Sequence, residues 1–350
     1  MDLSPDPSES PDPDEPALAQ HLADAIRTIV QQQYDRAQPS DPDGKTAFRD
    51  AHAKIVGLVR ATVTVRADLP SDLAHGVWKA GSVYKAWVRY SNGEGQPQSD
   101  GAKDARGMAI KLCALPSDLG ERLPGDTESH TQDFVMIDHP NFFIRDARQY
   151  VDFVDRKVAG KSVLGFVFPS VLPWNWRLRS LCIMLALQKD PRSHLAQTYH
   201  SMTPYRLGPH IVKLRCRPLH DVAARADEAY DSLRAALAAQ LASGDARFAL
   251  EVQRRNDESL SIEDARQRWP ENSAPFEQVA EVVIPQQTFA TPEQLAFGNR
   301  LSFSPWHGHL AHRPLGSLNR VRRLVYPASS TLRHSLNATP PLEPTGDETF

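Results

Sequence analysis

Five short clusters of histidine, arginine, serine and tyrosine are the parts of this sequence whose residue types could do chemistry. In chain order they are RDAHAK (49–54), WVRYSNG (87–93) with DARGMAIK (104–111), PNFFIRD (140–146), GPHIVKL (208–214) and RRLVYP (322–327), which Arg333 follows. A histidine can exchange a proton near neutral pH, a tyrosine can ligate a metal as its phenolate, and an arginine can pair with a carboxylate through two parallel hydrogen bonds. The clusters therefore hold the parts for proton transfer, metal ligation and anion binding.

Tyr326 and Arg322 are four residues apart, so a helix would place them on one face. A free phenol has a pKa of about 10, so a nearby cation is needed to hold its deprotonated form. Arg322 can supply that cation, and the alternative is an ordinary buried tyrosine. His52 stands just before a strand-like stretch, where a structural histidine is the alternative to a proton carrier.

The elements that must position these residues alternate between strand-like and helical patterns. Apolar residues at every second position predict a strand within 52–68. Similar patterns predict strands at 83–90, 107–112, 133–144, 210–215, 248–253 and 279–284, and helices at 17–36, at 223–242 and between the last two strands. We therefore expect an α+β protein, with a large antiparallel sheet or barrel and with inserted and appended helices.

Residues 163–187 are apolar, and Pro169 and Pro173 interrupt them. A buried core helix or a lid is the simplest interpretation, and contact with a membrane surface is the alternative. No stretch reaches about 18 consecutive apolar residues, so the sequence predicts no membrane-spanning helix.

Composition narrows the class of protein further. Residues 1–16 are acidic and Pro-rich, which predicts a disordered tail, and residues 337–350 predict a loose C-terminal tail, so that one domain is expected over 17–336. The overall charge is −3, with −6 in the first tail and +3 in the rest of the chain, so nothing favours nucleic-acid binding. Three cysteines and the lack of a basic, apolar leader favour a reduced, cytoplasmic protein.

Taken together and in this order, the five clusters resemble the catalase family. Family members carry a histidine in Arg-x-x-His-Ala-Lys, then Arg-(Phe/Tyr)-Ser, Asp-x-Arg-Gly-(Phe)-Ala-x-Lys, Pro-x-Phe-Phe-Ile-Arg-Asp and Arg-x-x-x-Tyr-Pro. The resemblance runs from about Arg49 to Arg333 and implies a catalase-like antiparallel β-barrel around a buried haem b. The chain looks like a minimal member without the C-terminal additions of long catalases, and it is also related to the catalase-like allene oxide synthases.

The resemblance implies a role for each matching residue. Tyr326 is the implied iron ligand, His52 the distal acid–base histidine, and Ser91 the residue that orients it. The implied cofactor-binding residues are Arg49, Arg89, Phe142, Tyr150, His210, Arg322 and Arg333. Three of these arginines, at 49, 89 and 333, would pair with the haem propionates. Ordinary salt bridges, core packing or a strand position are the alternatives for members of this set.

The distal side departs from the family pattern at one important position. Catalases carry an asparagine beside the histidine, and counting back from Phe142 places Ile137 there. If the turn shifts by one residue, Asp138 stands near the iron instead, where its carboxylate could raise the pKa of His52 or act as a second base. The alternative for Asp138 is a turn residue that caps local backbone.

This departure leaves more than one function open. The first is a small catalase or peroxidase that consumes hydrogen peroxide. The second is a catalase-like haem enzyme that transforms fatty-acid hydroperoxides or another organic substrate, which the apolar 163–187 segment favours. A haem-storage or sensing protein would leave His52, Ser91 and Arg322 without a purpose. Family assemblies imply a homodimer or homotetramer.

Overall fold

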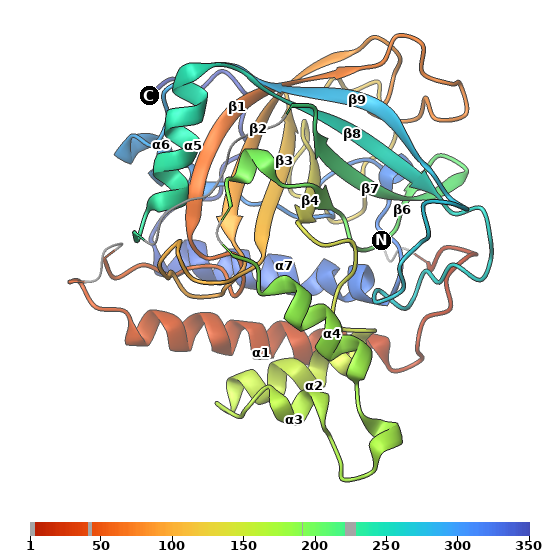
Figure 1. Cartoon of the computed structure of the whole chain (residues 1–350), viewed down its shortest axis with the longest axis vertical. Helices are drawn as coiled ribbons and strands as arrows, with labels where there is room; N and C mark the ends of the chain where they lie inside the picture. The colour runs from red at the N-terminus through yellow and green to blue at the C-terminus, as the bar shows by residue number, and fades with distance from the viewer. Residues whose placement is uncertain (1–3, 41–43, 191, 221–228) are drawn as a thin grey trace.

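An antiparallel β-barrel forms the centre of the molecule (Figure 1). The computed structural model describes residues 4–40, 44–190, 192–220 and 229–350. Within these ranges the strands are β1 (Ile55–Val65), β2 (Val83–Asn92), β3 (Arg106–Cys113), β4 (Gln132–Ile137), β5 (Tyr199–His200), β6 (Tyr205–Leu207), β7 (His210–Pro218), β8 (Ala246–Arg254) and β9 (Phe276–Ile284).

Eight of these strands close into a ring. β1 pairs with β2 and β9, and the strands from β2 to β5 pair in sequence order. The ring closes because β7 pairs with both β5 and β8, and β8 pairs with β9. β6 extends β7 as a short hairpin. Every one of these pairings is antiparallel, which confirms the predicted fold class.

The helices lie outside the barrel. They are α1 (Glu15–Arg36), α2 (Ala147–Val158), α3 (Leu164–Val167), α4 (Leu178–Leu187), α5 (Ser232–Ser243), α6 (Pro292–Arg300) and α7 (Ser317–Leu336), with short 3-10 turns η1 (Pro173–Asn175), η2 (His194–Ala196) and η3 (Leu310–His312). Within the described residues, no helix is long and apolar enough to cross a bilayer.

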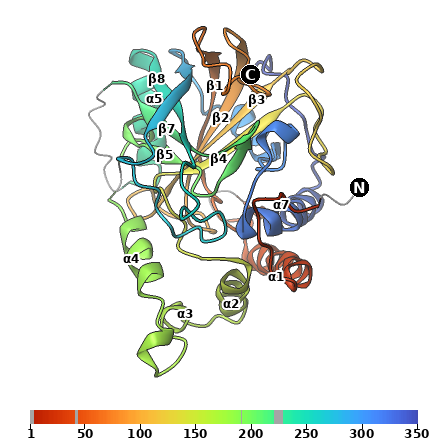
Figure 2. The same cartoon turned by 90° about the vertical axis from the view of Figure 1, so that its right-hand side faces the viewer.

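A layer of three helices, α1, α2 and α7, lies below one end of the barrel (Figures 1 and 2). The apolar face of α1 buries Leu22 and Ile26 against Val321 and Val325 of α7 and Val154 of α2. Side chains three and four positions apart share one face of a helix. The apolar face predicted at 17–36 is therefore the face of α1 that makes this contact. The layer brings α7 close to the open ends of the strands.

Two predicted elements differ from the structure. The expected helix between β8 and β9 is absent from the described chain, where turns span 255–275. Side chains bond the backbone of this connection and so compete with helix formation: Gln253 donates to the carbonyls of Trp269 and Ala274, and Arg255 donates to Leu260. The predicted strand over 133–144 ends at Ile137. Part of the predicted 223–242 helix lies outside the described residues.

The segments predicted as tails pack against the body of the protein. In the first, Asp6 pairs with Arg206, and Glu9 pairs with both Arg313 and Arg320. These acids of the described part of 1–16 thus meet arginines of the body, and the disorder expected for the segment stays a prediction. At the other end, Glu348 accepts a hydrogen bond from the indole of Trp87 at 2.8 Å.

Candidate active site

A cavity of about 510 Å³ lies between the barrel and the helical layer. It gathers most of the site residues that the sequence predicts. The predicted residues that line it are Arg49, His52, Arg89, Ser91, Phe142, Tyr150, Arg322, Tyr326 and Arg333. Residues far apart in the sequence therefore meet in one place, with the histidine at the entrance to β1 and the tyrosine on α7.

Backbone contacts hold His52 in an unusual conformation. Its φ is +56°, in the left-handed region that few residues other than glycine adopt. The His52 amide donates to the carbonyl of Gly93 at 3.1 Å, and the Ala53 amide donates to that of Glu94 at 3.0 Å. The Asp104 carboxylate accepts from the amides of Gly93 and Glu94 and fixes their loop. A residue beside a cavity whose strained backbone is held in place by several hydrogen bonds is typically a functional residue.

The His52 ring is paired with Ser91 and is uncharged at neutral pH. Its Nδ1 lies 3.1 Å from the Ser91 hydroxyl. Burial, with the positive charge of Arg89, lowers the pKa of His52 to about 4. A neutral imidazole can accept a proton, so His52 is suited to act as a base.

Gly107 makes room for this pair. Across the sheet, Gly107 lies opposite Ser91 on β2 and opposite Ile137 on β4. A Cβ atom on Gly107 would come within 2.6 Å of both His52 Nδ1 and Ser91 Oγ. Gly107 lies in the motif DARGMAIK, but the sequence alone assigns it no role. A residue without a side chain is needed here only because the strands pair in this register.

Tyr326 faces the cavity from the middle of α7, which also carries Arg322 and Arg333. Burial raises the pKa of the Tyr326 phenol, Arg322 and Arg49 lower it, and Asp50 raises it further. Arg322 lowers the pKa of Tyr326, as the sequence predicts, but burial raises that pKa by more. A phenolate at this position therefore needs an additional positive charge, such as a metal ion.

Three arginines surround the cavity without a carboxylate partner. Among the described residues, none of Arg49, Arg89 and Arg333 forms an ion pair, and Nε of both Arg89 and Arg333 has no hydrogen-bond partner. Arg89 donates to the carbonyl of His52 at 2.8 Å, and Arg49 donates to that of Leu301 at 2.6 Å. Buried guanidinium groups are normally paired with acids.

Burial, together with a neighbouring arginine for two of them, lowers the pKa of each of these arginines. Burial lowers the pKa of Arg49 to about 10 and that of Arg333 to about 8, where Arg49 also contributes. Burial, Arg49 and Arg333 together lower the pKa of Arg89 well below its ordinary value. Carboxylates bound in this cavity would relieve the repulsion among the three charges.

The rest of the cavity wall is apolar and aromatic. Arg322 lies over the ring of Phe142, 5.4 Å from its centre. Tyr150 and Phe143 also line the cavity, and Met184 of α4 lies at one side. The three unpaired arginines suit the two propionates of a haem, and the apolar and aromatic wall suits its flat ring. The residues therefore fit the group that the sequence resemblance implies.

Two predicted site residues do not reach the cavity. The Asp138 carboxylate accepts a hydrogen bond from the Arg106 amide at 2.9 Å and pairs with Lys189 at 3.1 Å. This is the alternative in which Asp138 caps local backbone instead of facing the cavity. Ile137, the last residue of β4, lines the cavity instead. His210 lies at the start of β7 and pairs with Asp72 at 3.4 Å, outside the cavity. The fold therefore does not bring Asp138 and His210 together with the other predicted site residues.

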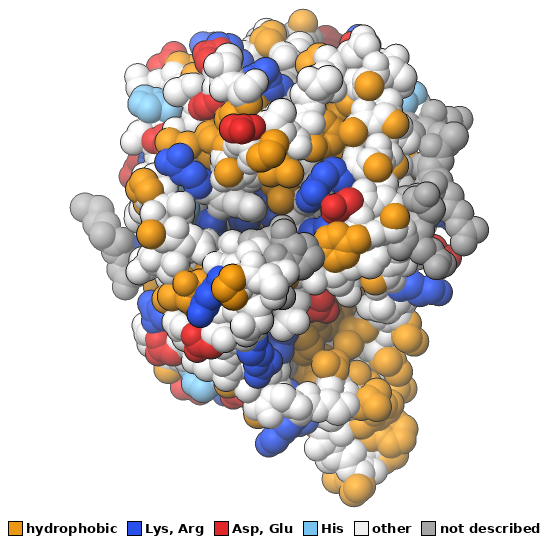
Figure 3. Space-filling model, turned by 90° about the vertical axis from the view of Figure 1, so that its left-hand side faces the viewer, with side chains coloured by type: hydrophobic (Ala, Val, Ile, Leu, Met, Phe, Trp, Pro, Cys, Tyr) orange, Lys and Arg blue, Asp and Glu red, His pale blue; other side chains and the backbone are white. Residues whose placement is uncertain are grey.

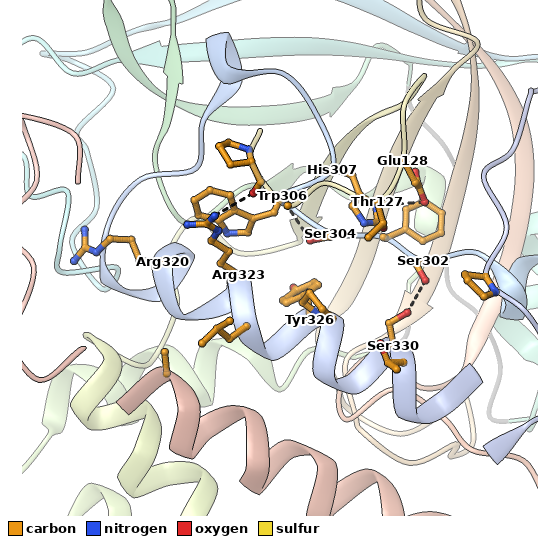
Figure 4. Close-up of a pocket in the computed structure, with 18 of the residues that line it drawn as sticks. Thr127, Glu128, Ser302, Ser304, Trp306, His307, Arg320, Arg323, Tyr326 and Ser330 are labelled. Carbon is orange, nitrogen blue, oxygen red and sulfur yellow. Dashed lines mark hydrogen bonds and ion pairs between the residues drawn. The ribbon is translucent and has the colours of Figure 1, made fainter. Parts of the chain in front are cut away.

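Tyr326 also borders a larger cleft of about 1420 Å³, which runs along the other side of α7 (Figure 4). Glu128 and His307 line this cleft, and with Asp133 they form a cluster of metal-ligand type. However, the Lys111 ammonium binds both carboxylates and occupies the centre of the cluster. Its charges are satisfied, so the cavity lined by the three unpaired arginines is the better candidate for a cofactor site.

The fold of the chain is that of the catalases. A fungal catalase matches with a TM-score of 0.64 and 18% identity, over 82% of this chain and 59% of that one. Catalase A from Saccharomyces cerevisiae matches with a TM-score of 0.64 and 17% identity, over 87% of this chain and 65% of that one. A bacterial catalase matches with a TM-score of 0.61 and 15% identity, over 98% of this chain and 66% of that one. This chain thus spans between 59% and 66% of their lengths. By sequence it matches no family model and no curated protein.

Proposed function

We propose that this chain binds haem b between His52 and Tyr326 and cleaves the O–O bond of a peroxide. The observation that carries the proposal is the set of arginines at 49, 89 and 333, which line one cavity and form no ion pair among the described residues. Two propionates would supply the missing negative charge. Tyr326 would ligate the iron, with Arg322 beside the phenolate, and Phe142 and Tyr150 would contact the ring.

A haem held by Tyr326 would supply the two electrons that O–O cleavage needs. The protein's own part is proton transfer. Neutral His52 accepts the proton of the peroxide and returns it to the departing oxygen, so that hydrogen peroxide releases water and an organic hydroperoxide releases an alcohol. Because Ser91 engages Nδ1, we assign this transfer to Nε2 of His52.

Organic hydroperoxides are the substrate class that the cavity favours over hydrogen peroxide. Ile137 stands where catalases carry an amide that helps to hold a second peroxide molecule, and it offers no hydrogen bond. Met184 and Leu187 extend the apolar wall toward α4. An apolar substrate chain can bury itself against these side chains.

The test uses the full chain loaded with haem and compares hydrogen peroxide with cumene hydroperoxide. We expect His52→Ala to lower the rate of reaction with either peroxide by about 10²-fold or more while haem stays bound. His210→Ala is the matched control, because it removes a histidine that lies outside the cavity. Equal rates for His52→Ala and the unmodified chain, or no haem uptake at all, would overturn the proposal. The cytoplasmic location and the homo-oligomer stay predictions.

A further inference from the structure

A protruding apolar segment stands beside the cavity. We define the tip segment as residues 163–187, which include α3, η1 and α4 and extend from the lower edge of the molecule (Figures 1 and 2). Side chains in its outermost part are highly exposed: Val171 is 91% exposed, Trp174 77% and Leu164 63%. Figure 3 shows hydrophobic side chains gathered on this projection. Large exposed apolar patches mark sites of interaction.

The distribution of tryptophan singles out the same place. The chain has six tryptophans, and the four outside the tip segment are buried. Trp174 and Trp176 are the exposed ones, and both lie at the tip. Tryptophan is enriched where protein meets the interfacial region of a bilayer, because its ring is apolar and its N–H is polar.

Charge within the tip segment is of one sign, since its charged residues are Arg177 and Arg179. Between Asp155 and Asp190 the chain has six Lys or Arg residues and no acidic residue; Arg156 and Arg177 pair with Asp152, and Lys189 pairs with Asp138. Lys161, just before the segment, and Arg179, within it, are exposed. Basic residues beside an exposed apolar surface are attracted to anionic lipid headgroups.

The tip segment is anchored and continuous with the cavity. Arg177 pairs with Asp152 of α2 at 2.5 Å and donates to the carbonyl of Phe166, which is fully buried. On the inner side, Val163, Met184 and Leu187 line the cavity itself. The exposed apolar surface and the candidate active site are therefore two ends of one structure.

We propose that the tip segment docks on the surface of a phospholipid bilayer with anionic headgroups and turns the mouth of the cavity toward it. Apolar hydroperoxides held in the bilayer would then reach the cavity without crossing water; this second part rests on the proposed function. A second copy of the chain fits less well, because two such segments would bring their positive charges together.

Docking is tested with vesicles of equal parts phosphatidylcholine and phosphatidylglycerol. We expect the full chain to co-sediment with them and its tryptophan emission to shift to the blue. The double variant Val171→Ser/Trp174→Ser removes only exposed side chains and should bind at least about tenfold more weakly. Val83→Ser is the control, since Val83 is 61% exposed at the start of β2 and outside the tip segment.

Two outcomes would overturn the docking proposal. One is vesicle binding that the double variant and Val83→Ser retain equally. The other is no vesicle binding, together with a dimer in sedimentation velocity that the double variant converts to a monomer, which would make the tip segment a contact between copies.

Delivery is tested with the haem-loaded chain on two substrates. A phospholipid hydroperoxide embedded in the same vesicles should be consumed about tenfold more slowly by the double variant, in step with its binding. Consumption of tert-butyl hydroperoxide in water should not change. Equal losses on both substrates would contradict delivery through the tip segment. If vesicles are bound but neither peroxide is consumed by the unmodified chain, the proposed function fails while docking stands.

Discussion

His52 combines strain, burial and nearby positive charge, and each has a consequence that can be measured. Its backbone is held in the left-handed region by the loop at 93–94, and its ring bonds to Ser91. Burial and Arg89 lower its pKa, so the neutral form persists well below neutral pH. The residue is prepared to accept a proton before any substrate arrives.

The rate of reaction with peroxide should therefore depend on pH in a particular way. Because the pKa of His52 is lowered to about 4, the neutral base is lost only as the pH falls through that value. We expect the rate constant of the haem-loaded chain to be constant from about pH 8 to about pH 5.5 and to fall below that range. Stopped-flow mixing with peroxide measures it, with circular dichroism to confirm folding. A midpoint near the ordinary histidine pKa of about 6.5 would contradict this account.

Gly107 gives a test of the geometry around the same histidine. Gly107→Ala places a methyl group within 2.6 Å of His52 Nδ1 and Ser91 Oγ, so the pair must separate. We expect the rate with peroxide to fall by about 10²-fold and the free energy of unfolding to fall by about 1–3 kcal/mol, with haem still bound. Gly244→Ala, where no atom lies within 4 Å of the new methyl group, is the control. Full activity of Gly107→Ala would show that the pair does not position the base.

At the scale of elements, α7 carries the largest share of the site. It presents Arg322, Tyr326 and Arg333 to the cavity, and its first turn is held by an acid from the N-terminal segment. Glu9 accepts a hydrogen bond from the Gly316 amide at 2.6 Å and pairs with Arg320 at 2.6 Å. A carboxylate at a helix N-terminus also complements the helix dipole.

Removing this acid should destabilise the whole fold. The Glu9 side chain is fully buried, so Glu9→Gln leaves buried arginine charge without its partner and should cost about 3 kcal/mol. Asp14→Asn is the matched control, because the pair of Asp14 with Arg148 is exposed and should contribute less than about 1 kcal/mol. Urea unfolding measures both. If Glu9→Gln costs no more than Asp14→Asn, the N-terminal segment is loose, as the sequence alone predicts.

Strands and the amphipathic helix were predictable because each is specified by local periodicity, as for β1 and α1. The ion pairs of the acidic segment at 4–14 were not predictable, since the partner arginines lie between 134 and 311 positions away. The site was predictable where family motifs cover it, as for Tyr326 and His52. The site was not predictable at Asp138, because the partners that hold its carboxylate, the Arg106 amide and Lys189, are distant from it in the sequence.

At the scale of the whole molecule, the barrel supplies the histidine side of the cavity and the helical layer supplies the tyrosine side. Neither half encloses the cavity alone. The barrel contributes Ser91 and Arg89 from β2, and α7 contributes the cation and the phenol four residues apart. The tip segment extends this enclosure outward and gives the molecule one apolar end (Figure 3). Cofactor binding should therefore join the two halves and stabilise the chain.

The most direct test of this account is the absorption spectrum of the haem-loaded chain beside that of Tyr326→Phe. We predict that the unmodified chain takes up one haem and shows a high-spin ferric spectrum with a phenolate-to-iron charge-transfer band. Tyr326→Phe should lose that band and most of its haem affinity, while Tyr34→Phe, on α1 and outside the cavity, should keep both. Unchanged haem uptake and an unchanged spectrum in Tyr326→Phe would contradict the central claim that Tyr326 holds a haem iron.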